Sequence, residues 1–262
     1  IALRLGDFLR DEGKEDEAIE VYKNAIGSFS REIALLGKMR IANIQAQRPF
    51  SKEYLDAIKI YDEIITRYPD SALVEESMLR KGLTLTLFSN YLKAIEALES
   101  FQQQYSNSVY VQRGVIQENI DENLKGLIDH YFQMGDYLGV VGVYQDYKAK
   151  YLSNFRFDVT IFQIGVAYQK LGMYNESLDL FTFLEPNAAT LKELTQLQSA
   201  EALIQKNDLP QSRDNLARFI QTYQTSPYDA DTRKRLTEVY EQNRQYPEAI
   251  AVYEQTIQKY SK

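Results

Sequence analysis

The residue types that most often carry out catalysis or hold metals are scarce in this sequence. His130 is the only histidine and there is no cysteine, so disulfides and thiolate metal sites are excluded. One imidazole cannot complete a zinc site by itself, and every Ser-His-Asp triad would have to include His130. Because Tyr131 follows it on a predicted helix, we expect this histidine at the surface or at the edge of the core.

Carboxylates are abundant, but their positions favour helix starts and solvated faces. Asp11-Glu12 and Glu75-Glu76 are of this kind, and a glycosidase pair would need a cleft that raises the pKa of one carboxyl. The glycine-rich stretch GDYLGVVG (135–142) lacks the strand-then-helix setting of a nucleotide-binding loop. We therefore predict that the chain is not an enzyme, with no catalytic residue, no cofactor and no metal site.

The composition of the chain narrows the classes of partner. Hydrophobic residues make up 44% of the 262 residues, so the chain can bury a large core. The formal net charge is −7. The negative charge disfavours nucleic acid and anionic membrane. No apolar run approaches the roughly 18 residues of a membrane span, which predicts no direct membrane insertion. Because the chain opens on Ile1, we expect a segment of a longer protein.

The sequence contains a repeated pattern, and the elements that this pattern forms must position any functional site. A small or apolar residue, here called the anchor residue, is followed four positions later by an aromatic residue or leucine. The anchors lie 39, 37, 46, 37, 35 and 37 residues apart, and this near-regular spacing indicates a repeat architecture. The anchors are Ala18, Ala57, Ala94, Val140, Ser177, Ser212 and Ala249.

The repeats share several features around the anchor residue. An aromatic residue stands eleven positions after the anchor in six of the seven repeats. Gly13, Gly135, Gly172 and Asn207 stand five positions before it, where a helix must end in the left-handed conformation. Apolar residues at three- and four-residue spacing run on both sides of this turn, which predicts two amphipathic helices per repeat.

The pattern resembles the tetratricopeptide repeat. The stretch QIGVAYQKLGMYNESLDLF (163–181) matches that family's consensus almost throughout, and the resemblance covers essentially the whole chain. It implies an all-α, right-handed α–α superhelix of about seven helix-turn-helix repeats in a single domain, 1–262. The implied repeats are 1–30, 31–69, 70–107, 108–153, 154–187, 188–226 and 227–262.

We predict a helix pair for each repeat. The pairs are 2–11/15–28, 31–47/52–67, 71–88/91–105, 109–134/137–151, 155–171/174–185, 188–206/209–224 and 227–243/246–260. The loop at 46–52 is about three residues longer than the others. The fourth repeat has about nine surplus residues within 106–126, which form either a longer first helix or an extra short one.

Two positions in the stretch YDEIITRYPDSALVEESMLRKG (61–82) predict local packing. Pro69 ends one helix, and Asp70 or Ser71 then caps the next one. Gly82 lies inside that next helix although glycine costs about 1 kcal/mol of helix propensity. We expect that a side chain there would clash with the second helix of its own repeat, with Ala94 facing it.

The long repeats and the Tyr-Pro-Asp-Ser junction (68–71) suggest a setting. They are similar to the bacterial envelope branch of the family, as in the outer-membrane assembly lipoprotein and the Tol–Pal-associated coordinator. The resemblance thus implies a periplasmic or outer-membrane-associated protein, with the cytoplasm as the alternative.

The first helices are expected to hold the binding site, because ligands of the family lie along the concave face that these helices line. Carried over by position, the partner-binding groove is Leu79, Leu83, Leu87, Phe132, Phe162, Val166, Leu197, Glu201 and Ile204. This implies a non-enzymatic scaffold that binds a peptide or protein segment in an envelope assembly. The alternative is a structural spacer or a self-association module.

Overall fold

The computed structural model describes residues 1–48, 52–151 and 157–261 of the chain, and all regular structure in these ranges is helical. The prediction of an all-α helical repeat fold is therefore confirmed. The chain divides into two compact units, Ile1–Gly126 and Leu127–Lys262, and each is described by itself. The grouping of all repeats into one domain stays a prediction.

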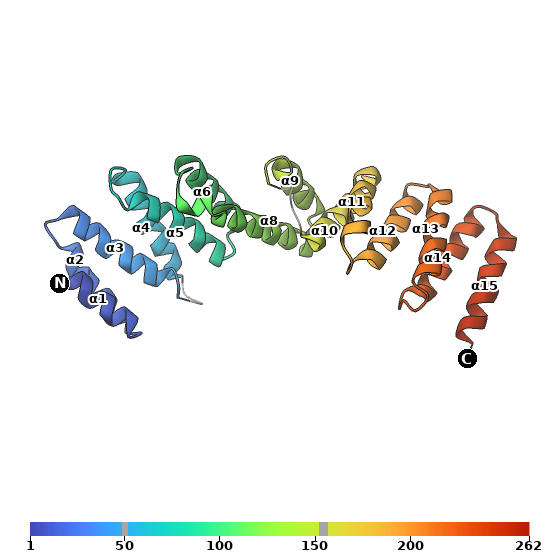
Figure 1. Cartoon of the computed structure of the whole chain (residues 1–262), viewed down its shortest axis with the longest axis horizontal. Helices are drawn as coiled ribbons and strands as arrows, with labels where there is room; N and C mark the ends of the chain where they lie inside the picture. The colour runs from blue at the N-terminus through green and yellow to red at the C-terminus, as the bar shows by residue number, and fades with distance from the viewer. Residues whose placement is uncertain (49–51, 152–156, 262) are drawn as a thin grey trace. The chain divides into compact units, whose positions relative to one another are not determined.

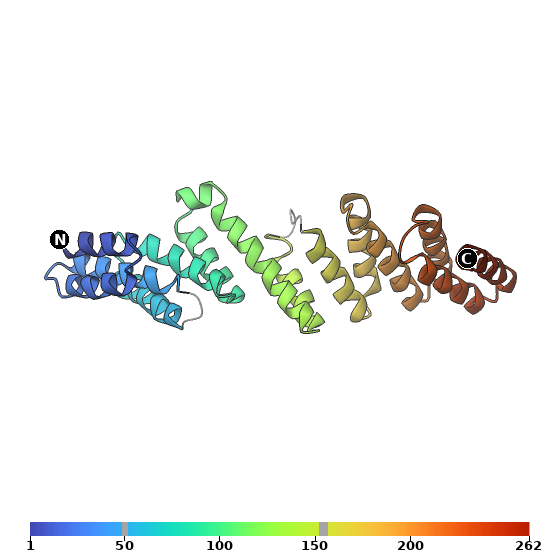
Figure 2. The same ribbon diagram turned by 90° about the horizontal axis from the view of Figure 1, so that it is seen from below.

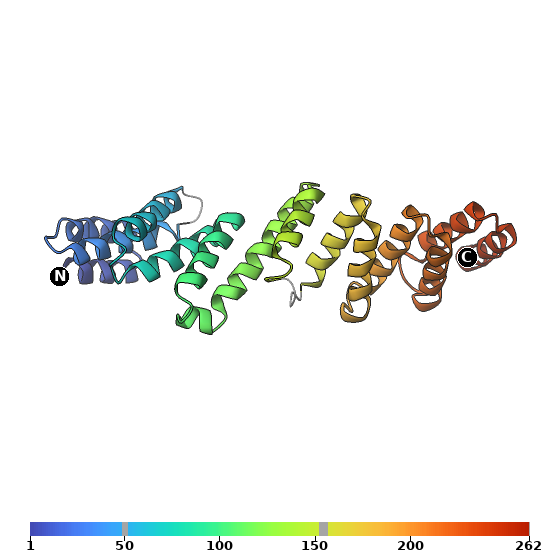
Figure 3. The same cartoon turned by 90° about the horizontal axis from the view of Figure 1, so that it is seen from above.

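The first unit contains three helical hairpins and a short extra helix, with consecutive helices side by side in chain order (Figure 1). The helices are α1 (Ala2–Asp11), α2 (Glu15–Ile26), α3 (Arg31–Gln45), α4 (Glu53–Arg67), α5 (Val74–Leu87), α6 (Tyr91–Gln104) and α7 (Val109–Gln112). The helix α8 (Val115–Gln133) begins in this unit and ends in the second one. The surplus residues of the fourth repeat thus form an extra short helix, α7, which leads into α8 (Figure 3).

The second unit continues the same arrangement with four hairpins, the first of which starts in α8 (Figure 2). Its helices are α9 (Tyr137–Tyr147), α10 (Asp158–Lys170), α11 (Tyr174–Asn187), α12 (Lys192–Gln205), α13 (Leu209–Thr222), α14 (Asp229–Gln242) and α15 (Tyr246–Tyr260). Most helix ends lie within three residues of the predicted ones. The predicted start at 155, and part of the predicted loop 46–52, lie outside the described residues.

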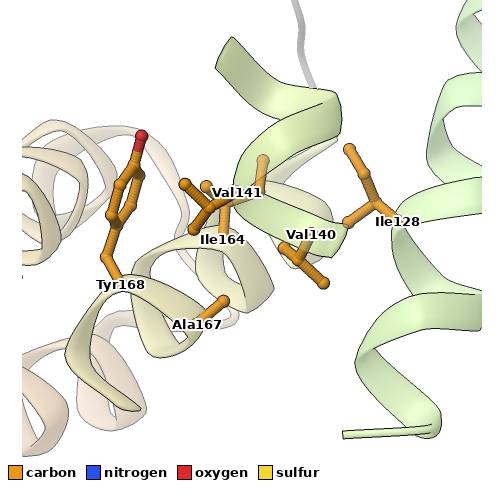
Figure 4. Packing of buried hydrophobic residues seen from close by; sticks show 6 residues of the cluster. All are labelled: Ile128, Val140, Val141, Ile164, Ala167 and Tyr168. Atoms are coloured by element: carbon orange, nitrogen blue, oxygen red, sulfur yellow. The ribbon is translucent and has the colours of Figure 1, made fainter. Parts of the chain in front are cut away.

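The anchor residues form the centre of the core. All seven are buried, with exposed fractions of 0 to 3%. In the second unit, Val140 belongs to a cluster that joins three helices. Figure 4 shows Ile128 of α8, Val140 and Val141 of α9, and Ile164 and Tyr168 of α10 gathered in this cluster. Burial of large apolar side chains of this kind supplies about 1.5–3 kcal/mol each.

The turns within the hairpins have the predicted left-handed residue. Gly13, Gly135, Gly172 and Asn207 have φ values of 78°, 73°, 77° and 65°, which confirms the prediction. Ser89 and Arg244 occupy the same repeat position with φ values of 56° and 57°. These two positions could not be recognised from residue type, because neither side chain favours positive φ.

Small residues on the first helix meet large ones on the second. A Cβ atom added at Gly82 would lie 2.7 Å from Cδ2 of Leu98 on α6, so the predicted clash within the repeat is confirmed. The partner is Leu98, one helical turn beyond the expected Ala94. Gly6 meets Tyr22 and Gly165 meets Phe181 in the same way, and in all three pairs the partner lies sixteen residues further along the chain.

The predicted cap at the Tyr-Pro-Asp-Ser junction is wrong in its details. The helix α5 begins at Val74, and its N-cap residue Leu73 makes no side-chain capping bond. The Ser71 hydroxyl accepts a hydrogen bond from the Leu73 N–H at 3.2 Å and donates one to Glu32 at 3.1 Å. The Ser71 hydroxyl therefore links the start of α5 to α3. Residues 70–73 form turns and a bend, so α5 begins at Val74.

Candidate partner-binding site

The nine predicted groove residues lie on the first helices of their repeats, as their positions require. Leu79, Leu83 and Leu87 are on α5, Phe132 on α8, Phe162 and Val166 on α10, and Leu197, Glu201 and Ile204 on α12. Their exposure is uneven. Leu87 is 63% exposed and Leu79 only 5%, while the others are half-buried.

Two of the predicted aromatic residues pack within their own hairpins. The ring of Phe132 lies 5.9 Å from that of Tyr137, and the ring of Phe162 lies 5.7 Å from that of Phe181. Neither phenylalanine, nor Val166, lines any of the three hollows described below. The remaining six predicted residues all line one or two of these hollows.

A hollow of about 120 Å³ lies between α3 and α5 in the first unit, and we call it the α3–α5 hollow. Leu83 and Leu87 form its apolar part. Asn43 and Tyr61 form its polar part, with the Tyr61 hydroxyl donating a hydrogen bond to Oδ1 of Asn43 at 2.8 Å. Burial raises the pKa of Tyr61, so this tyrosine stays neutral. The full lining is Asn43, Ala46, Gln47, Tyr61, Arg80, Leu83, Thr84 and Leu87.

A larger hollow of about 510 Å³ lies beside α5 in the same unit, and we call it the α5–α7 hollow. Leu79 and Leu83 form the apolar part of its lining, together with Tyr110 of the extra helix α7. The Arg80 guanidinium lies 3.4 Å from a carboxylate oxygen of Glu76. Ala72 and Glu75 complete the lining.

The second unit has a hollow of about 200 Å³ between the first helices α12 and α14, called the α12–α14 hollow. Arg235 of α14 reaches across to Glu201 of α12 at 2.8 Å and also contacts Glu238 at 3.0 Å. The hydrogen bond to Glu238 and the charge of Glu201 raise the pKa of Arg235. The lining is Leu197, Gln198, Glu201, Ile204, Leu216, Tyr228, Asp231, Thr232 and Arg235.

The sequence reasoning missed several lining residues. Arg80 and Arg235 both stand fourteen positions before their anchors, and Glu76 and Asp231 both stand eighteen before. A comparison of these outward positions between repeats would have found them. Tyr110 carries no such signal because it lies in the surplus of the fourth repeat.

The described residues also bear on the chemistry considered at the start. His130 is exposed, with its ring 6.0 Å from that of Tyr131. Within the described ranges, no three His, Cys, Asp or Glu residues lie close enough together to hold a metal ion. Among the described helices, none combines the length and the hydrophobicity that a membrane crossing requires.

Models of the tetratricopeptide repeat match four segments of the chain, residues 1–29, 38–71, 76–108 and 232–259. Each segment coincides with one helical hairpin, so the matches support the resemblance seen in the repeat pattern. No curated protein matches the sequence. Tetratricopeptide repeats generally mediate protein–protein interaction, and the scaffold that they form is typically not an enzyme.

Several solved structures have a similar fold. A chain in the structure of Naa15/Naa10 bound to HypK-THB is 14% identical over 100% of this chain and 36% of its own length, with a TM-score of 0.52. This chain thus spans about a third of that relative. The C-terminal part of a TPR repeat-containing protein from Cytophaga hutchinsonii is 15% identical over 97% of this chain and 94% of its own, with a TM-score of 0.45. The TPR2AB domain of yeast Sti1, in a pHSP90 complex, is 14% identical over 92% and 96%, with a TM-score of 0.38.

Proposed function

We propose that this chain is a non-enzymatic scaffold that binds a segment of a protein partner on its first helices. The observation that carries the proposal is the recurrence of apolar hollows at the same repeat positions in both units. Leu79 and Leu197 stand fifteen positions before their anchors, and Leu83 and Glu201 stand eleven before. These side chains line hollows, whereas the anchors are buried in the core.

The size of the hollows suits side chains of a peptide or of a helix. Hollows of about 120 to 510 Å³ are large enough for one or two apolar side chains. Small apolar recesses of this kind commonly receive the side chains of a partner that contribute most to binding. Leu87 projects with 63% of its surface exposed, so part of the apolar surface is already available to a ligand.

The proposal can be tested with peptides selected from a random phage-displayed library against the whole chain. Leu83→Glu in the first unit and Ile204→Glu in the second place a charge inside a hollow, where a buried apolar contact of the ligand would be lost. Since burying one leucine contributes about 1.5–3 kcal/mol, we expect affinity to fall at least about tenfold in the variant whose hollow the peptide occupies.

Matched controls come from exposed leucines outside the hollows. Leu92 on α6 is 47% exposed and Leu138 on α9 is 72% exposed, and neither lines a described hollow. Leu92→Glu and Leu138→Glu should leave binding unchanged, and circular dichroism should show equal helix content in all four variants. Selected peptides that bind the hollow variants as well as the parent chain would contradict the proposal.

We further propose that this protein acts in a bacterial envelope assembly, in the periplasm or at the outer membrane. The support is the Tyr-Pro-Asp-Ser junction at residues 68–71 together with repeats longer than the usual length. Fractionation of cells that express the full-length protein is the test. Recovery with the cytoplasmic fraction would refute this setting without affecting the scaffold proposal.

A second candidate function is self-association, in which a second copy would cover the exposed face of α15. Tyr253 is 44% exposed, whereas Tyr22 and Tyr61 at the same repeat position are completely buried. Ile250 and Ile257 on the same helix are 56% and 63% exposed. If a second copy covers this face, light scattering should show a concentration-dependent dimer that Ile257→Glu abolishes. A monomer at all concentrations would refute this candidate.

A further inference from the structure

We propose that the α5–α7 hollow and the α12–α14 hollow each accept a lysine or arginine side chain that stands next to an apolar side chain in the bound segment. The inference rests on the proposed function, because the same hollows are involved, and it adds the chemistry of the partner. The two hollows lie in different units, and each carries the site by itself.

The two hollows have the same chemical composition although only part of it follows from the repeat. Each has a floor of leucine or isoleucine, one tyrosine, one arginine and two carboxylates. The tyrosines, Tyr110 and Tyr228, are 43% and 38% exposed, so part of each side chain is accessible to a ligand. They do not share a repeat position, since Tyr110 comes from the extra helix α7.

In each hollow, one carboxylate takes no part in the ion pairs that the structure describes. Arg80 is paired with Glu76, and Arg235 is paired with Glu201 and Glu238. In the part of the chain that the structure describes, Glu75 and Asp231 have no ion-pair partner. A cation that enters would therefore find an uncompensated carboxylate in a hollow that a tyrosine also lines. It would gain both an ion pair and a cation–π contact.

A second aromatic ring lies close to the carboxylate in the first unit. Burial, and then the negative charge of Glu75, raise the pKa of Tyr105. The ring of Tyr105 lies 5.4 Å from that of Phe101, at an angle of 36° between the ring planes. Glu75 thus acts on Tyr105 and lines the same hollow as Tyr110, a setting that favours a cation over an anion.

Helix stability explains the carboxylates only in part. Glu75 and Glu76 are in the first turn of α5, and Asp231 is in the first turn of α14, where acidic residues complement the helix dipole. That role requires neither a tyrosine wall nor an apolar floor. An acidic ligand would meet the surplus carboxylates in both hollows and the net charge of −7, so charge complementarity selects a basic segment.

The test uses the random peptide library on the whole chain and reads the sequences that it selects. We expect lysine or arginine next to leucine, isoleucine or phenylalanine. A selected peptide is then titrated against Glu75→Gln and Asp231→Asn, and affinity should fall about three- to fivefold for the variant whose hollow it occupies. Tyr110→Ala should weaken peptides of the first hollow by a similar factor.

Glu20→Gln is the matched control, because it removes the same charge from α2, outside the hollows, where the side chain is 70% exposed. It should leave affinity unchanged, and a loss as large as that of Glu75→Gln would overturn the inference. Selected peptides that are acidic, or apolar without a basic residue, would also overturn it while the scaffold proposal stands. A library that yields no binder would overturn both.

Discussion

Gly82→Ala tests the contact between small and large residues on which the hairpins depend. Two effects of the substitution oppose each other. Alanine would gain about 1 kcal/mol of helix propensity over glycine. Its Cβ atom, however, would lie 2.7 Å from Cδ2 and 2.9 Å from Cγ of Leu98, whereas carbon atoms prefer separations of about 3.5–4.0 Å.

The contact decides the sign because Leu98 has no room to retreat. Its side chain is completely buried, so it would have to shift by about 0.8 Å within a packed core. Overpacking of this kind costs about 1–3 kcal/mol, and the atoms of Leu98 closest to the new methyl include Cγ as well as the flexible end. We expect Gly82→Ala to lower the free energy of unfolding by about 1 kcal/mol.

Gly142→Ala is the matched comparison. Gly142 also lies inside a helix, α9, but a Cβ atom there would meet nothing within 4 Å. Only the propensity term remains, so this variant should raise the free energy of unfolding by about 0.5–1 kcal/mol. Urea denaturation followed by circular dichroism measures both variants, and native-state hydrogen exchange assigns each change to its own helices.

The decisive control removes the obstacle. In a Leu98→Ala background, Gly82→Ala should no longer destabilise, so the two substitutions should be coupled by about 1 kcal/mol or more in a double-mutant cycle. If Gly82→Ala stabilised the chain as much as Gly142→Ala does, or if the cycle were additive, the close-packing explanation of the repeat glycines would be refuted.

Two further predictions concern the second unit. Asp229 is fully buried, and its Oδ2 accepts hydrogen bonds from Arg233 at 2.8 Å, Lys259 at 2.7 Å and Tyr260 at 2.6 Å; burial opposes its ionisation, but these donors hold its pKa below the usual value. Its contribution to stability is therefore complete above the unfolded pKa of about 4 and is lost as the pH falls through the lower folded value. Asp229→Asn should cost about 3 kcal/mol at pH 7 and flatten this acid dependence, and an unchanged urea midpoint would refute the role of the cluster. Arg244→Gly should stabilise the chain by about 0.5–1 kcal/mol because Arg244 is held at a φ of 57°, and a lower melting temperature would contradict the strain argument.

The sequence predicted the fold more fully than the site, and particular residues show why. The anchors and Gly82 were recognisable because packing restricts residue type at a fixed spacing. Ser89 and Arg244 take the same left-handed turn as Gly13 without a residue type that reveals it. Phe162 was predicted for the groove, and its ring lies 5.7 Å from that of Phe181, a contact that the spacing alone does not reveal. The direction of an aromatic side chain depends on its neighbours and not on its spacing.

The difference between core positions and hollow positions also indicates where binding specificity can change in this architecture. Positions that touch the second helix, such as Gly82 and Gly165, are fixed by contacts with Leu98 and Phe181, so substitution there costs stability. Positions fourteen and eighteen before the anchor line the hollows, and they are Arg80 and Glu76 in one unit and Arg235 and Asp231 in the other. Arg80 pairs with Glu76, and Arg235 pairs with Glu201 and Glu238. Exposed ion pairs contribute little to stability. A charge placed there therefore changes what the hollow binds while the hairpin beneath it remains intact.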